Sequence, residues 1–148
     1  MGIRELAWNA IKWKFIKKRL KYTNEEMKKF RETPRNEDVL TKALELQVKT
    51  IIAEVVNSHG CNSQHEVGDT FHFDVAGNLI TEQCPKRVCI YALNAITPQV
   101  FAANEMLYAG IDPNEMRFRR AACFDVGLEC GGWGRIVMEL KVEDRNKV

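Results

Sequence analysis

Five cysteines and a histidine are the residues of this 148-residue chain best suited to chemistry. The cysteines are Cys61, Cys84, Cys89, Cys123 and Cys130. Their odd number argues against the paired disulfide framework of a secreted protein. Cys61 and His65 are four positions apart, so one loop can present a thiolate and an imidazole to the same ion. Zinc and iron both accept these donors, which predicts a metal site without fixing the metal.

The cysteines fall where predicted elements end rather than on their faces, as buried structural cysteines would. They follow strands (Cys61, Cys123), flank the start of a helix (Cys84, Cys89) or lie in a glycine-rich loop (Cys130). We therefore expect loops at one end of a sheet to bring several of them together. His59 is a substitute ligand if His65 points away. Asp69 and Asp125 could orient His65 by hydrogen bonds from outside the set of metal ligands. Alternatively, they are solvated carboxylates in turns.

Thiol chemistry is the enzymatic alternative. Cys89 stands at the start of a predicted helix, where the helix dipole and Lys86-Arg87 would lower its pKa. Cys84 would then act as the resolving thiol, although Cys-x4-Cys is not the spacing of dithiol oxidoreductases. The sequence has no phosphate-binding loop or hydrolase motif, so no nucleotide cofactor is expected.

The elements that must position these residues belong to an α+β domain over residues 36–148. Alternating or β-branched residues predict strands at 48–56, 67–73, 116–124 and 134–142, with a hairpin return at 79–81. A helix is predicted at 36–46. A central helical pair is predicted from residue 87, its second member starting at Thr97-Pro98 and ending at Gly110. This order predicts a small, mostly antiparallel sheet.

Residues 1–35 form a predicted basic helical arm. They carry a net charge of +7, against −5 for residues 36–148. Thr23 and Glu26 predict a capping box between two amphipathic helices. The candidate partner-binding residues of the arm are Trp8, Lys12, Trp13, Lys17, Lys18 and Arg19. Such a helix can dock on a protein partner, pack on its own domain or a second copy, or bind nucleic acid or an anionic membrane surface.

The chain has 45% hydrophobic and 28% charged residues, which are globular proportions. It contains no apolar stretch long enough to cross a membrane and no secretory signal pattern, so we expect a soluble cytoplasmic protein.

Three segments resemble the signature of a small prokaryotic domain family without an established activity. Residues 61–71 are similar to its Cys-x-x-Gly-His-x-Val-Gly-Asp-x-Phe motif, 89–93 to its Cys-Pro-Tyr-Ala-Leu-like helix start, and 123–125 to its late cysteine and acidic position. The resemblance covers about residues 48–142. It departs from the motif at Gln64 and Ile90, where the family has glycine and proline. The extra Cys84 and Cys130 leave open a different choice of metal ligands or a second thiol pair.

The resemblance implies one shared polar set, Cys61, His65, Cys89 and Cys123, which has the composition of a closed zinc site. We therefore expect a zinc- or iron-binding accessory protein, or a small subunit of a larger enzyme, whose arm docks on a protein partner or a second copy. An open site with one ligand missing would instead activate water.

Overall fold

The computed structural model describes residues 3–145, with the backbone alone for residues 3–9 and 44. The chain divides into two compact units, Met1–Glu45 and Leu46–Val148. The first unit is helical and the second is an α+β domain, which confirms the predicted fold class. Among the described helices, none has the length and apolar character needed to span a membrane.

The first unit contains α1 (Ile3–Leu20), α2 (Asn24–Arg31) and α3 (Pro34–Leu46). The predicted capping box is present at the start of α2. The Thr23 backbone N–H donates to the Glu26 carboxylate at 2.7 Å, and the Glu26 N–H donates to the Thr23 hydroxyl at 3.2 Å. These two bonds satisfy donors that an uncapped helix leaves free, so the chain turns sharply between α1 and α2.

Lys12, predicted to bind a partner, serves the packing of this unit. Its side chain is 7% exposed, and its ammonium lies 3.1 Å from the Glu37 carboxylate on α3. The Asn36 side chain also donates to the Phe30 carbonyl, at 2.6 Å. These contacts bind α3 to α1 and α2 within the compact unit Met1–Glu45. Trp8 lies in α1, but its side chain is outside the described part of the structure.

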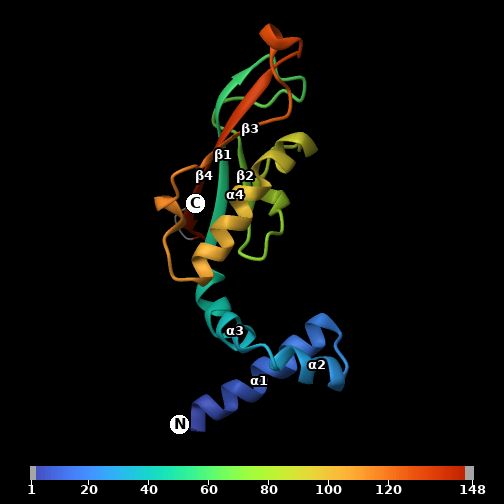
Figure 1. Ribbon diagram of the computed structural model, residues 1–148, viewed down its shortest axis with the longest axis vertical. Helices are drawn as coiled ribbons and strands as arrows, with labels where there is room; N and C mark the ends of the chain where they lie inside the picture. Colours follow the sequence, from blue (N-terminus) through green and yellow to red (C-terminus); the bar gives the residue numbers. More distant parts are fainter. Residues whose placement is uncertain (1–2, 146–148) are drawn as a thin grey trace. The chain divides into compact units, whose positions relative to one another are not determined.

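In the second unit, the described strands form one antiparallel sheet in the order β2-β1-β4-β3 (Figure 1). The strands are β1 (Lys49–His59), β2 (Thr70–Phe73), β3 (Arg120–Ala122) and β4 (Arg135–Asp144). β1 and β4 are paired from Lys49↔Asp144 to His59↔Arg135, with one irregularity at Val56. Alternate residues of β4 point into the core, as the sequence predicts, because successive side chains of a strand face opposite sides.

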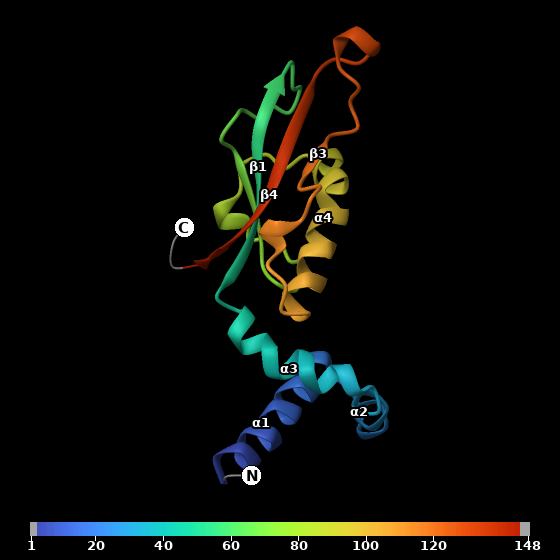
Figure 2. The ribbon, with the colours of Figure 1, turned by 60° about the vertical axis from the view of Figure 1, so that its left-hand side comes forward.

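One helix, α4 (Ile90–Tyr108), covers the core face of this sheet (Figure 2). The predicted helical pair is therefore wrong, because the helix continues through Pro98. Thr97 and Pro98 are exposed, and the Thr97 hydroxyl donates to the Leu93 carbonyl at 2.7 Å. The buried residues Ile96 and Val100 on either side of Pro98 pack on the sheet. Their burial outweighs the backbone hydrogen bond that proline removes.

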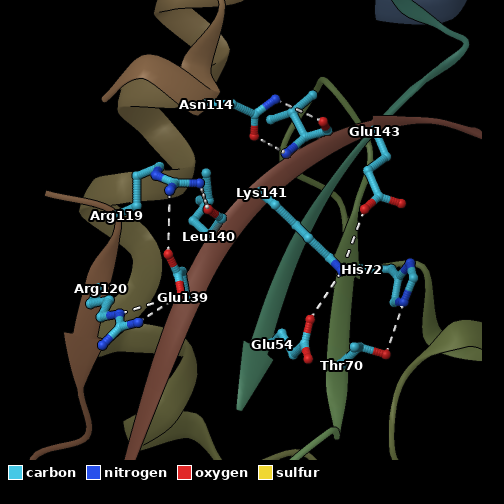
Figure 3. Close-up of polar contacts among 11 residues, drawn as sticks. Glu54, Thr70, His72, Asn114, Arg119, Arg120, Glu139, Leu140, Lys141 and Glu143 are labelled. Atoms are coloured by element: carbon cyan, nitrogen blue, oxygen red, sulfur yellow. Dashed lines mark hydrogen bonds and ion pairs between the residues drawn. The ribbon is translucent and has the colours of Figure 1, made fainter. Parts of the chain in front are cut away.

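The other face of the sheet carries a ladder of charges (Figure 3). The Lys141 ammonium lies 3.0 Å from the Glu54 carboxylate and 3.4 Å from that of Glu143. His72 is buried beside them and its Nε2 lies 3.0 Å from the Thr70 hydroxyl. Burial and the positive charge of Lys141 lower the pKa of His72, which keeps this imidazole neutral near pH 7.

Three predicted extended segments are shorter than expected. Residues 67–69 form a turn before β2, where Gly68 has a φ of +96°. The Gly68 N–H donates a hydrogen bond to the Val55 carbonyl, next to the irregular position of β1. Residues 79–81 contribute a single bridge, between Leu79 and Phe73, instead of a strand. Of the segment 116–124, only Arg120–Ala122 is a strand.

Replacing Pro98 by alanine tests the continuous helix. Alanine restores the missing N–H and removes the clash within the helix, so we expect Pro98→Ala to raise the free energy of unfolding by about 1–2 kcal/mol. Ile96→Ala is the contrasting variant and should lower it by about 2–4 kcal/mol, because Ile96 is fully buried. Chemical denaturation measures both. A loss of stability in Pro98→Ala would contradict this account of α4.

Candidate functional site

A cavity of about 560 Å³ lies in the α+β unit, at the end of the sheet where β1 finishes and β4 begins. Its walls come from the loop after β1, the start of α4 and the connection between β3 and β4 (Figure 1). The four residues that the motif singles out all line it: Cys61, His65, Cys89 and Cys123. The fold thus brings together side chains that are up to 62 positions apart in the sequence.

Two glycines hold the walls of the cavity together. A Cβ atom on Gly134 would lie 2.1 Å from the backbone carbon and oxygen of Gly60, so the two backbones touch where β1 and β4 end. Gly60 also has a φ of +63°, a conformation that side chains disfavour. This contact places the loop carrying Cys61 directly beside the loop carrying Trp133.

The Cys61–His65 loop is a tight turn. The Gln64 N–H donates to the Cys61 carbonyl at 3.0 Å, and Gln64 has a φ of +63°. This is the left-handed conformation that glycine adopts without strain, at the position where the family motif has glycine. The Ser58 hydroxyl donates to the His65 carbonyl at 2.6 Å and ties the end of the turn to β1.

His65 is held in one orientation. Its side chain is 2% exposed, its ring packs edge-on against Phe71 at 5.1 Å, and its Nδ1 lies 3.6 Å from an Asp69 carboxylate oxygen. The Glu66 N–H donates to the same oxygen at 3.0 Å, which fixes the carboxylate. Nε2 is buried without a hydrogen-bond partner. Nδ1 faces the carboxylate, so Nε2 is the nitrogen available to a ligand.

Cys89 occupies the N-cap position of α4, with an extended backbone. Burial opposes ionisation of its thiol. The N–H groups of Ala92 and Tyr91 and the side chain of Ser63 outweigh burial and hold the pKa of Cys89 below its ordinary value. The sequence predicts this direction from the helix start, but it does not indicate Ser63, whose only signal is its place inside the Cys61–His65 loop.

Cys123 and Asp125 lie on the third wall. The Ile136 N–H donates to the Cys123 sulfur at 3.4 Å, across from β4. Asp125, predicted to orient His65, instead accepts from the backbone N–H groups of Gly127, Trp133 and Gly134 at 2.9–3.3 Å. These bonds, led by that from Gly127, lower the pKa of Asp125. The carboxylate therefore closes the glycine-rich loop that borders the cavity.

The remaining candidates lie elsewhere. Cys84 does not line the cavity, and its thiol donates to the Ile80 carbonyl at 3.2 Å beside β2. Burial raises the pKa of this thiol. Cys130 and His59 are exposed and also lie outside the cavity lining. The predicted pairing of Cys89 with Cys84 as attacking and resolving thiols is therefore not supported, because only Cys89 reaches the cavity.

The residues around the cavity do not form a closed metal site in this structure. Among side chains in the described part of the chain, no three from His, Cys, Asp and Glu are positioned to hold one ion together. Its mouth carries exposed apolar residues that the sequence analysis did not assign to the site: Ile90, Tyr91, Phe124, Val126 and Trp133. Tyr91 and Phe124 contact each other with ring centres 6.2 Å apart.

Comparisons with known proteins add no further assignment: no family model, curated protein or solved structure matches this chain. The resemblance to the cysteine-histidine family therefore rests on the motif residues alone and stays a prediction.

Removing the charge of Asp125 should loosen the loop. Asp125→Asn should speed amide exchange at Trp133 and Gly134, because a neutral amide accepts these hydrogen bonds less strongly. Glu129→Gln, an exposed change in the same loop, should leave exchange unchanged. The folded-state pKa of Asp125 is depressed, so this contribution is present above the ordinary pKa of 3.8 and is lost as the pH falls further. Equal exchange in both variants would contradict this role.

The opposite pKa shifts of the two thiols predict different reactivities. At pH 7, iodoacetamide should alkylate Cys89 faster than Cys84, because the thiolate is the nucleophile. Ser63→Ala should slow alkylation of Cys89, and Asn62→Ala in the same loop should not. Peptide mass spectrometry over a pH series measures each site. A faster reaction at Cys84 would overturn the assignment.

Proposed function

We propose that the α+β unit binds zinc or iron through Cys61, His65, Cys89 and Cys123, and acts as an accessory protein or small subunit. The observation that carries this proposal is that these four residues line the same cavity. They come from three separate segments, and their donor types are those of structural zinc sites. Cysteines that are buried only as small apolar side chains would not need a buried and oriented imidazole beside them.

The state of His65 favours a cation as the ligand. Its unpartnered Nε2 is buried, and a buried polar atom without a partner costs about 1–3 kcal/mol. A metal ion at this nitrogen would remove that cost. The Asp69 carboxylate lies 3.6 Å from Nδ1, on the side of the ring where a carboxylate accepts a hydrogen bond from a metal-binding histidine.

The thiols can complete the site with small movements. Cys89 is already biased toward the thiolate that a metal requires. Cys61 and Cys123 are partly buried at the cavity wall, in or beside loops rather than inside strands. The proposal requires these side chains to adopt χ1 rotamers that turn the sulfurs toward Nε2 of His65. With four protein ligands no position stays open for a substrate, so the metal would stabilise the fold rather than catalyse.

Metal content in cysteine variants tests the proposal. Anaerobically purified protein should hold about one ion per chain, and Cys61→Ser, Cys89→Ser, Cys123→Ser and His65→Gln should each lose it and unfold more easily. Cys84→Ser and Cys130→Ser remove thiols outside the cavity and should keep the ion. Asp69→Asn should weaken binding by about 10–100-fold.

Two results would contradict the proposal. One is equal metal content in all six ligand and control variants. The other is a full count of five reactive thiols in the native protein after reconstitution with either metal.

Thiol chemistry at Cys89 is a second candidate, favoured by the lowered pKa of this cysteine in the cavity. Its partner would be Cys61 or Cys123 rather than Cys84. Formation of the disulfide would transfer two electrons to an added oxidant and release two protons. Mild oxidation of metal-free protein followed by peptide mapping shows whether Cys89 pairs with Cys61 or with Cys123. A disulfide to either cysteine would be recovered only if the two sulfurs can come into contact.

A further inference from the structure

We propose that the outward face of α1 binds an anionic membrane surface. This face is defined by Ile11 and Phe15 with Lys14, Lys18 and Arg19 around them, and it is separate from the cavity of the α+β unit.

The apolar part of this face is unusually open. Ile11 is 57% exposed and Phe15 is 55% exposed, and their i, i+4 spacing puts them side by side on the helix. Arg19, one turn further on, lies over the Phe15 ring at 5.9 Å. An arginine stacked on a phenylalanine presents an apolar ring and a cation to the same surface.

Two other side chains of α1 are already used for packing within the unit. The Trp13 ring meets Phe30 edge-on at 6.3 Å, and Lys12 is buried against Glu37. Ile11 and Phe15 take no part in these contacts, so the helical unit does not need them for its own core. These exposed apolar side chains are therefore available to contact an external surface.

The charges identify what that surface is. Within the described part of the helical unit, Lys14, Lys18 and Arg19 form no ion pair, and residues 1–35 carry a net charge of +7. Unpaired cations around a short apolar strip are the pattern of helices that lie in the headgroup layer. Each basic residue near an anionic bilayer adds to the attraction, while the apolar pair enters the acyl boundary.

The contacts of Trp13 argue against single-stranded nucleic acid as the preferred occupant; the side chain of Trp8, the other tryptophan of this unit, lies outside the described part of the structure. Binding without sequence preference uses aromatic faces on which bases stack. Two cations already lie over the Trp13 ring, Arg31 at 4.6 Å and Lys12 at 5.3 Å. The ring is therefore engaged within the unit, whereas a lipid surface requires only the exposed face of α1.

Vesicle sedimentation with the full chain tests the proposal. We expect the protein to sediment with vesicles of phosphatidylglycerol and phosphatidylcholine, but not with phosphatidylcholine alone, and to be released by salt. Lys18→Gln with Arg19→Gln should weaken binding by about 25-fold, since each charge contributes about fivefold. Ile11→Ser with Phe15→Ser should weaken it by roughly tenfold or more. Lys18→Arg with Arg19→Lys is the charge-matched control and should bind as the native chain does.

Circular dichroism and metal content check that each variant stays folded, which the exposure of these residues predicts. Failure to sediment with anionic vesicles overturns the proposal. So does a fluorescent single-stranded RNA that binds while the vesicles do not, or a dimer that the Ile11, Phe15 variant dissociates without any vesicle binding. None of these results bears on the metal site, whose test uses different variants.

Discussion

The pairing of β1 with β4 extends over the whole length of both strands and ends where Gly60 and Gly134 touch. Close backbone contact of this kind leaves no room for side chains, so it fixes the distance between two loops that would otherwise move independently. One loop carries Cys61 and His65, and the other leads from Cys123 back into β4. α4 packs on the same sheet and delivers Cys89 from its first turn. The cavity therefore exists because the two central strands have this register.

The strongest patterns of the sequence were sufficient for the fold class and for the long strands. Ile136, Met138, Leu140 and Val142 recur at every second position, and all four are buried on one side of the sheet. The helix boundary was missed because Thr97-Pro98 has the chemistry of a helix start, yet tertiary packing of Ile96 and Val100 carries α4 through it. The contact between α1 and α3 was not predicted, because no sequence pattern reveals the pairing of Lys12 with Glu37.

More of the candidate site could be predicted than the local spacing of the cysteines and His65 suggests. Cysteines at the ends of elements pointed to a common location, and the motif selected the four that line the cavity. Cys84 lies outside the cavity lining although it is only five positions from Cys89, because closeness in sequence does not fix the direction of the chain after β2. For Asp125 the sequence left two roles open, orienting His65 or serving in a turn, and the structure shows its carboxylate accepting hydrogen bonds from backbone N–H groups of the neighbouring glycine-rich loop. Only three-dimensional contacts distinguish these cases.

X-ray absorption at the zinc edge of reconstituted protein tests the central claim most directly, because it counts the atoms bound to the ion. The account predicts about three sulfurs near 2.3 Å and one nitrogen near 2.0 Å. The His65→Gln variant should lose the nitrogen contribution if it still holds zinc. A shell of oxygen and nitrogen atoms without sulfur would contradict the proposal that Cys61, Cys89 and Cys123 bind the metal.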